Sequence, residues 1–145
     1  MKKVCVFLIL FTLCAVQCYA LNLKECGISL LSETTVALNA DADTVIYTVP
    51  TGKRCVLECA VLVAGTDAGA TTTISIGQNG AETDFLAANT LSNLDAQYDA
   101  VILRPIPNTT TLKSKSYAAG TVIDARIANQ SGGATNTLYL FGFLY

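Results

Sequence analysis

Apolar side chains recur at every second position through residues 45–63. The repeating residues are Val45, Tyr47 and Val49 in the first half and Cys55, Leu57, Cys59, Val61 and Val63 in the second. A period of two is typical of a β-strand, because an α-helix would place apolar residues three and four apart. Between the two halves, Pro50 restricts φ and Gly52 allows a positive φ, which favours a tight turn over residues 50–53. The pattern predicts a β-hairpin over residues 45–63, with Glu58 on the face opposite the cysteines.

The same alternation predicts strands on both sides of this hairpin. Upstream, residues 21–38 have a polar lead-in and then a strand-like run, in which one face carries Ile28, Leu30, Ser32, Thr34, Val36 and Leu38. Downstream, the strand-like segments are residues 71–77, 98–103, 111–117, 122–128 and 138–145. Residues 85–94 fit either a short helix or an irregular crossover. Residues with strong turn preference separate the segments, as in Asn79-Gly80.

These segments amount to eight or nine short strands at roughly even spacing. Such a pattern predicts an all-β chain, folded as a single antiparallel β-sandwich or jelly roll. The 145 residues suit one domain. We expect residues 21–40 to form an amino-terminal arm or first strand and residues 41–145 to form the sandwich. Residues 138–145 are apolar on both faces, which predicts a strand covered on both sides, either within the fold or by a neighbouring molecule.

The amino terminus has the organisation of a secretory signal. Lys2 and Lys3 precede an apolar run over residues 4–16, and the small residue Ala20 follows. The run is shorter than the ~20 residues that a membrane-spanning helix needs. We therefore predict a signal peptide over residues 1–20, and a mature protein that is secreted or at the cell surface and free of the membrane after cleavage.

Composition narrows the classes of function. Apolar residues make up 52% of the chain and charged residues 14%, which excludes a disordered tail. Without Lys2 and Lys3 the chain keeps seven basic and eleven acidic residues, a net charge of −4 that does not suit nucleic-acid binding. The chain has no histidine, the commonest general base and zinc ligand, and no tryptophan. We expect a protein that is not an enzyme and that holds no metal or cofactor.

Three cysteines remain after removal of the predicted signal: Cys26, Cys55 and Cys59. Cys55 and Cys59 would lie roughly 13 Å apart along one strand at ~3.3 Å per residue. A disulfide needs Cα atoms within ~7 Å, so these two cannot pair directly. Two interpretations stay open. Either Cys26 pairs with one of them and ties the arm to the hairpin, or all three are small buried apolar side chains.

Other polar groups suggest sites only weakly. Asp41 and Asp43 lack the further oxygen ligands and the glycine of a calcium loop. Glu82 and Asp84 lie beside a turn without an aromatic groove for a sugar, and Ser114 lies between two lysines in a predicted edge strand. We interpret all five as solvated residues.

Two asparagines fit the acceptor pattern for N-glycosylation. Asn108 begins Asn-Thr-Thr and Asn129 begins Asn-Gln-Ser, and both fall in predicted loops. They are candidate glycosylation sites.

Four stretches of the chain carry a resemblance to known proteins. They are YTVPTGKRCVL at residues 47–57, TTTISIGQNGAETDFLAANTLSNLDAQYDAVIL at 71–103, YAAGTVIDARIAN at 117–129 and LYLFGFLY at 138–145. Together they resemble small β-sandwich structural proteins of tailed phages, which carry a VPxGK hairpin, an S-x-G turn with an Asp-Phe step and an AAGTVI strand. The resemblance implies a virion decoration or fibre role. The signal peptide departs from that family, because a virion subunit assembled in the cytoplasm needs no export, and it favours an exported relative.

The leading hypothesis is therefore an exported structural subunit that self-assembles, as a homo-oligomer or polymer, into an extracellular filament or surface coat. The arm would be donated to a neighbour's sheet through the candidate assembly contacts Ile28, Leu30, Val36 and Leu38. Equally, the arm can be the first strand of its own sandwich.

Two alternatives are a virion decoration protein and a carbohydrate-binding or adhesin module. In the second, a glycan would be the partner, and Tyr98, Tyr117 and Tyr139 would stack on its sugar rings.

Overall fold

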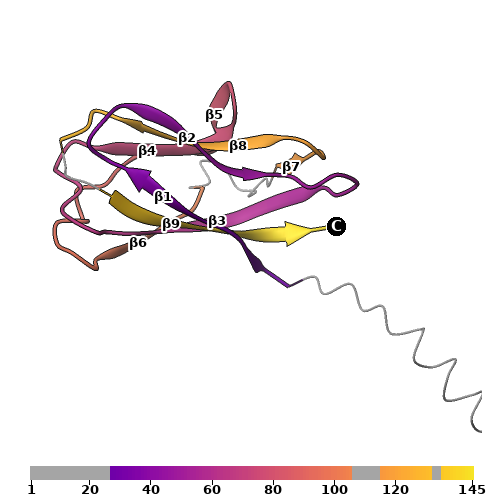
Figure 1. The fold of residues 1–145 in the computed structure, drawn as a ribbon, viewed down its shortest axis with the longest axis horizontal. Coiled ribbons are helices and arrows are strands. Elements are labelled where there is room, and N and C mark those ends of the chain that lie inside the picture. The colour runs from indigo at the N-terminus through magenta and orange to yellow at the C-terminus, as the bar shows by residue number, and fades with distance from the viewer. Residues whose placement is uncertain (1–26, 106–114, 132–134) are drawn as a thin grey trace, which may run out of the picture.

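The computed structural model of the protein describes residues 27–105, 115–131 and 135–145. These residues form nine β-strands and no helix, which confirms the prediction of an all-β chain (Figure 1). The strands are β1 (Ser29–Ala37), β2 (Ala42–Thr48), β3 (Cys55–Val63), β4 (Thr73–Gln78), β5 (Ala81–Thr90), β6 (Ala100–Leu103), β7 (Ser116–Tyr117), β8 (Val122–Ala128) and β9 (Thr135–Leu144). The described part of the chain holds no helix long and apolar enough to cross a membrane. The predicted signal peptide lies outside the described residues.

The strands form two antiparallel sheets, seen as the lower and upper layers in Figure 1. Sheet A has the order β1-β9-β3-β6, with β7 also paired to β3, and sheet B has the order β2-β8-β4-β5. The pairs are nested: β4 pairs with β5, β3 with β6, β2 with β8 and β1 with β9. The chain thus runs out and back like one long hairpin that is folded across both sheets.

The core lies between the two sheets. Sheet B contributes the fully buried Ile74, Ile76, Leu86, Ile123 and Ile127, and sheet A contributes Val36, Leu57, Leu62, Leu138 and Leu140. They belong to one continuous apolar cluster. In each sheet the side chains that alternate with these point away from the core, because successive residues of a strand face opposite sides.

The predicted hairpin over residues 45–63 is wrong, although its turn is correct. Lys53 donates a backbone hydrogen bond to Pro50 over 3.2 Å, and Gly52 has a φ of 74°. On one side of the turn, Val49 donates to Thr121 over 2.9 Å beside β8, whereas on the other side Arg54 and Tyr145 exchange hydrogen bonds of 2.9 and 3.0 Å beside β9. The turn carries the chain from sheet B to sheet A, so β2 and β3 do not pair.

Three β-bulges shift which side chains face the core. In β3, a register shift between Leu57 and Cys59 keeps Leu57 inward and then turns Ala60 and Leu62 inward, so Cys59 points outward. The prediction that Cys55, Leu57, Cys59, Val61 and Val63 share one face is therefore wrong.

A second bulge, between Leu30 and Ser32, divides the predicted single face of the amino-terminal arm. A third, between Val45 and Tyr47, leaves Val45 57% exposed and buries Ile46. In each strand, the inserted residue switches the inward positions from odd to even numbers or the reverse. A strict period of two therefore assigns the wrong face to the residues on one side of the bulge.

The ambiguous segment at residues 85–94 is a strand over most of its length, because β5 continues to Thr90. Phe85 and Leu86 are both buried, which obscures the alternation. The predicted strand at residues 111–117 is described only from residue 115, where β7 spans two residues.

Candidate assembly surface

The face of sheet A that points away from the core is apolar. Directly paired residues of an antiparallel ladder lie on the same face of the sheet. The pair Leu57 and Gly142 is buried and faces the core, so the adjacent pair Cys59 and Phe141 faces outward. Leu30 also pairs with Phe141 and extends this row to the edge of the sheet.

Parallel rows of outward residues lie beside the first. Tyr139 pairs with Val61, and Val61 pairs with Ile102. Beyond the Cys59 and Phe141 row, Phe143 pairs with Val56. Beyond the Tyr139 and Val61 row, Val63 is the next outward residue of β3. We call this set the apolar outer face: Leu30, Val56, Cys59, Val61, Val63, Ile102, Tyr139, Phe141 and Phe143.

The apolar outer face is exposed in the single chain. Leu30 and Ile102, at its two edges, are 51% and 66% exposed, and the central residues are partly exposed. In Figure 1 no labelled element lies on this side of sheet A. Residues 138–145 are thus covered on one face by the core, and among the described residues no strand covers their other face.

Polar groups form the rim of this face. Arg54 donates a hydrogen bond from Nε to Ser116 Oγ over 3.0 Å, and the Tyr145 hydroxyl lies 2.8 Å from the same atom. The hydrogen bonds with Ser116 and Arg54 lower the pKa of Tyr145. The Tyr145 ring lies 6.1 Å from the ring of Phe143. These contacts fix one end of the face.

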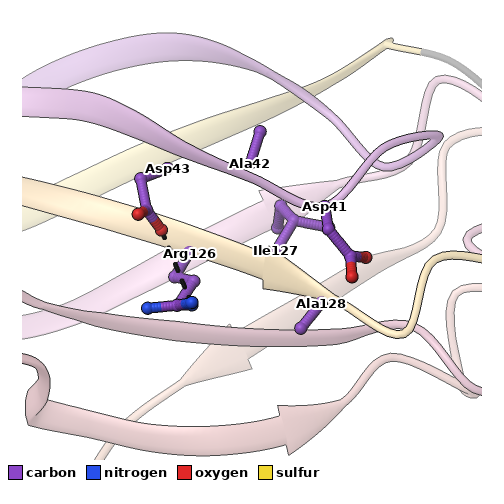
Figure 2. A pocket seen from close by; sticks show the side chains of 6 residues that line it. All are labelled: Asp41, Ala42, Asp43, Arg126, Ile127 and Ala128. Carbon is purple, nitrogen blue, oxygen red and sulfur yellow. Dashed lines mark ion pairs between the residues drawn. The ribbon is translucent and has the colours of Figure 1, made fainter.

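The outward side of sheet B has a different chemistry. Arg126 lies 3.7 Å from a carboxylate oxygen of Asp43 and 3.7 Å from one of Glu82. Beside them is a pocket of about 130 Å³, lined by Asp41, Ala42, Asp43, Arg126, Ile127 and Ala128. Figure 2 shows Asp43 directed at Arg126 and Asp41 directed away from both. The described residues contain no group of three or more potential metal ligands, and the two aspartates do not converge on one point.

Asp84 belongs to a cluster that joins the two sheets. Its Oδ1 atom accepts hydrogen bonds from the Tyr117 hydroxyl over 2.6 Å and from the backbone of Gln78 over 3.1 Å, and its Oδ2 atom pairs with Lys115. Tyr117 is only 2% exposed. Burial, the hydrogen bond to Asp84 and the charge of Asp84 raise the pKa of Tyr117. The partners of Asp84 all act to hold it in place, which supports a structural role.

Alkaline pH is expected to destabilise the protein through Tyr117 and Cys55. Burial raises the pKa of the Cys55 thiol from its ordinary value of 9.0 to about 11. Both groups hold their proton more tightly in the folded state than in the unfolded state. Their contribution to stability is therefore complete below about pH 9, and it is lost as the pH rises toward their folded-state pKa values. Urea unfolding at about pH 8 and at about pH 10.5 measures the resulting fall in the free energy of unfolding.

A double variant, Cys55→Ala with Tyr117→Phe, isolates this contribution. It should lose less unfolding free energy between the two pH values than the wild type does, even though its stability at about pH 8 is lower. Tyr98→Phe is the control, because Tyr98 is 78% exposed. An equal fall in the double variant and the wild type would contradict the assignment.

The structure separates the four candidate assembly contacts. Val36 and Leu38 are fully buried in the core of their own chain, where β1 pairs with β9. Ile28 is 63% exposed, and Leu30 lies on the apolar outer face. In this single chain the arm is the first strand of its own sandwich, and its donation to a neighbour stays a prediction.

The remaining candidate residues are dispersed. Cys55 is buried, Cys59 is partly exposed, and neither forms a disulfide with another described residue. Asn129 is exposed at the end of β8 with a φ of 54°, which leaves it a candidate for glycosylation. Cys26, Asn108 and Ser114 lie outside the described residues.

The three tyrosines proposed for sugar stacking do not form one platform. Tyr117 is buried, Tyr139 lies on the apolar outer face, and Tyr98 is exposed in the connection before β6. Tyr98 has a φ of 73°, an unfavourable conformation for a residue with a side chain, and its backbone donates to Ala64 over 2.8 Å.

Four of the nine residues of the apolar outer face have no signal of their own in the pattern of separate segments. Val56, Ile102, Phe141 and Phe143 belong to it, and they come from three strands that are distant in the sequence. The available signal was the run at residues 138–145, which is apolar at both parities. It indicated a second covered face but did not identify the other strands.

Comparisons with known proteins give a likeness of fold. No family model matches the chain, and no curated protein matches its sequence significantly. The fold is similar to a chain in the acid-stable capsid structure of Helicobacter pylori bacteriophage KHP30, with a TM-score of 0.53 and 16% identity over 80% of this chain and 87% of that chain. A chain of the cyanophage Pam1 capsid asymmetric unit matches with a TM-score of 0.41 and 18% identity, over 81% and 85% of the two chains. The resemblance to β-sandwich structural proteins of phages is thus confirmed at the level of the fold.

Proposed function

We propose that the protein is a non-enzymatic structural subunit of a virion-type shell or surface coat, built on a jelly roll. The observation that carries the proposal is the nested strand order, β1-β9-β3-β6 in one sheet and β2-β8-β4-β5 in the other. Jelly rolls made of two four-stranded sheets occur in viral capsid domains, and also in lectins. The likeness to a phage capsid chain of similar length supports the first of these.

The distribution of side chains supports an assembly role over a binding role. The apolar outer face extends over four strands of sheet A, and the pocket on sheet B is small and lies beside ion-paired side chains. The glycan-binding alternative loses support because Tyr117 is buried. Within the proposal, residues 1–20 direct export, and the mature chain assembles outside the cytoplasm.

Secretion of the full chain from a suitable host tests this function. We expect the secreted protein to begin at Leu21 and to form ordered filaments, lattices or shells by electron microscopy. A protein that stays monomeric at all concentrations, with or without its first 20 residues, would contradict self-assembly. A chain that stays inside the cell with its first 20 residues uncleaved would contradict export, and self-assembly would stand.

A further inference from the structure

We propose that two copies of this chain associate face to face through the apolar outer face of sheet A. This inference rests on the proposed function and names the partner at that surface. The partner's surface is the same set of residues, so the pair is closed by a two-fold axis.

The outward faces of the two sheets differ in chemistry. An antiparallel sheet with one solvated face normally carries polar side chains on it. Sheet B follows this rule with Asp43 and Arg126, which are exposed on its outward side. At the equivalent positions of sheet A, the central strand β9 carries Tyr139, Phe141 and Phe143. Aromatic residues are the type enriched at protein interfaces.

The apolar outer face has the size of a small protein interface. β3 has nine residues, which span about 30 Å at ~3.3 Å per residue. Four strands spaced ~4.8 Å apart give a width of about 15–20 Å. The face therefore offers about 500 Å² per copy, and a pair would bury about 1,000 Å², which is about the minimum for a biological interface.

The charges at the two edges of the face are complementary to each other. Glu33 lies on β1 at one edge of sheet A, and Arg104 directly follows β6 at the other edge, and both are exposed. A two-fold axis parallel to the strands places the β1 edge of one copy against the β6 edge of the other. Glu33 of each copy then lies near Arg104 of the other at both edges of the pair, whereas edges with the same charge would repel.

Sedimentation of charged variants tests the proposal. Ile102→Lys and Leu30→Lys place a charge on the face at positions that are already exposed, so the fold should tolerate them. Each is expected to weaken association about tenfold or more. Val45→Lys is the matched control, because Val45 is 57% exposed on the outward side of sheet B, and its association should equal that of the wild type.

Cys59 supplies a second readout that is specific to this face. We expect labelling of Cys59 by a maleimide to slow as protein concentration rises, because a second copy covers it. Peptide mass spectrometry reads the label at Cys59 separately from any label at Cys26. Cys55 is buried and serves as an internal thiol that stays unlabelled in the folded protein. Ile102→Lys should restore fast labelling of Cys59 at high concentration, and Val45→Lys should not.

Three other outcomes would overturn the proposal. Ordered assemblies in which Cys59 labels at the same rate at every concentration would show that another surface associates, and the proposed function would stand. Monomers without any assembly would overturn both proposals. Protection of Cys59 in a monomer that keeps residues 1–26 would show that the chain's own amino terminus covers the face.

Discussion

Replacing Gly142 with alanine is expected to lower the stability of the folded protein strongly. A Cβ atom at this position would lie 2.3 Å from the backbone oxygen of Val56 and 3.2 Å from Cα of Leu57. Both atoms belong to β3, which lies between β9 and β6 and cannot move without breaking the ladder. We expect a loss of about 3 kcal/mol in the free energy of unfolding, at the upper end of the range for overpacked core substitutions.

Gly27→Ala is the matched control for this variant. No atom lies within 4 Å of a Cβ at Gly27, and its φ is not in the left-handed region. Soluble yield and urea denaturation of the two variants give the comparison, with Gly27→Ala close to the wild type. A Gly142→Ala protein with an unchanged unfolding midpoint would show that β9 and β3 can separate locally at low cost.

The environment of Gly142 also illustrates how far the sequence predicts this fold. Residues 138–145 were correctly predicted as a strand with two apolar faces, because alternation and composition are local properties. The close approach of Gly142 to Val56 depends on the bulge in β3, where Leu57 and Cys59 oppose adjacent residues of β9. A bulge is a property of the paired ladder, so a single strand's pattern does not reveal it.

The wrong hairpin has a related cause. Two alternating strands and a Pro-Gly turn are compatible with pairing across the turn, and equally with strands that enter opposite sheets. The choice is made by partners more than seventy residues away: β8 for Val49 and β9 for Arg54. Non-local pairing of this kind has no signature within residues 45–63.

The candidate surface was predictable only in part for the same reason. Leu30 was named as an assembly contact, but its proposed companions Val36 and Leu38 face the core, because the bulge after Leu30 reverses the parity of β1. Ile102 joins the face from β6, whose pairing with β3 crosses almost forty residues. Composition indicated that a second apolar face exists, and the topology determines which residues form it.

Deletion of residues 29–38 from the chain is expected to abolish cooperative folding. Val36 and Leu38 are fully buried, and loss of two such side chains costs about 3–6 kcal/mol. The deletion also leaves the backbone donors and acceptors of β9 without their partners in β1. A typical domain is stable by only about 5–15 kcal/mol, so the truncated chain should show no sigmoidal urea transition.

Adding β1 back as a separate peptide distinguishes its two possible roles. A peptide of residues 27–40 should restore a cooperative transition to the truncated chain, and the same peptide with Val36→Asp and Leu38→Asp should not, because it cannot fill the core. Rescue would show that the edge of sheet A accepts a strand from another molecule, which is the step that strand donation between subunits requires. A truncated chain that unfolds at the wild-type midpoint without peptide would contradict the structural role of β1, since the core would then be complete without Val36 and Leu38.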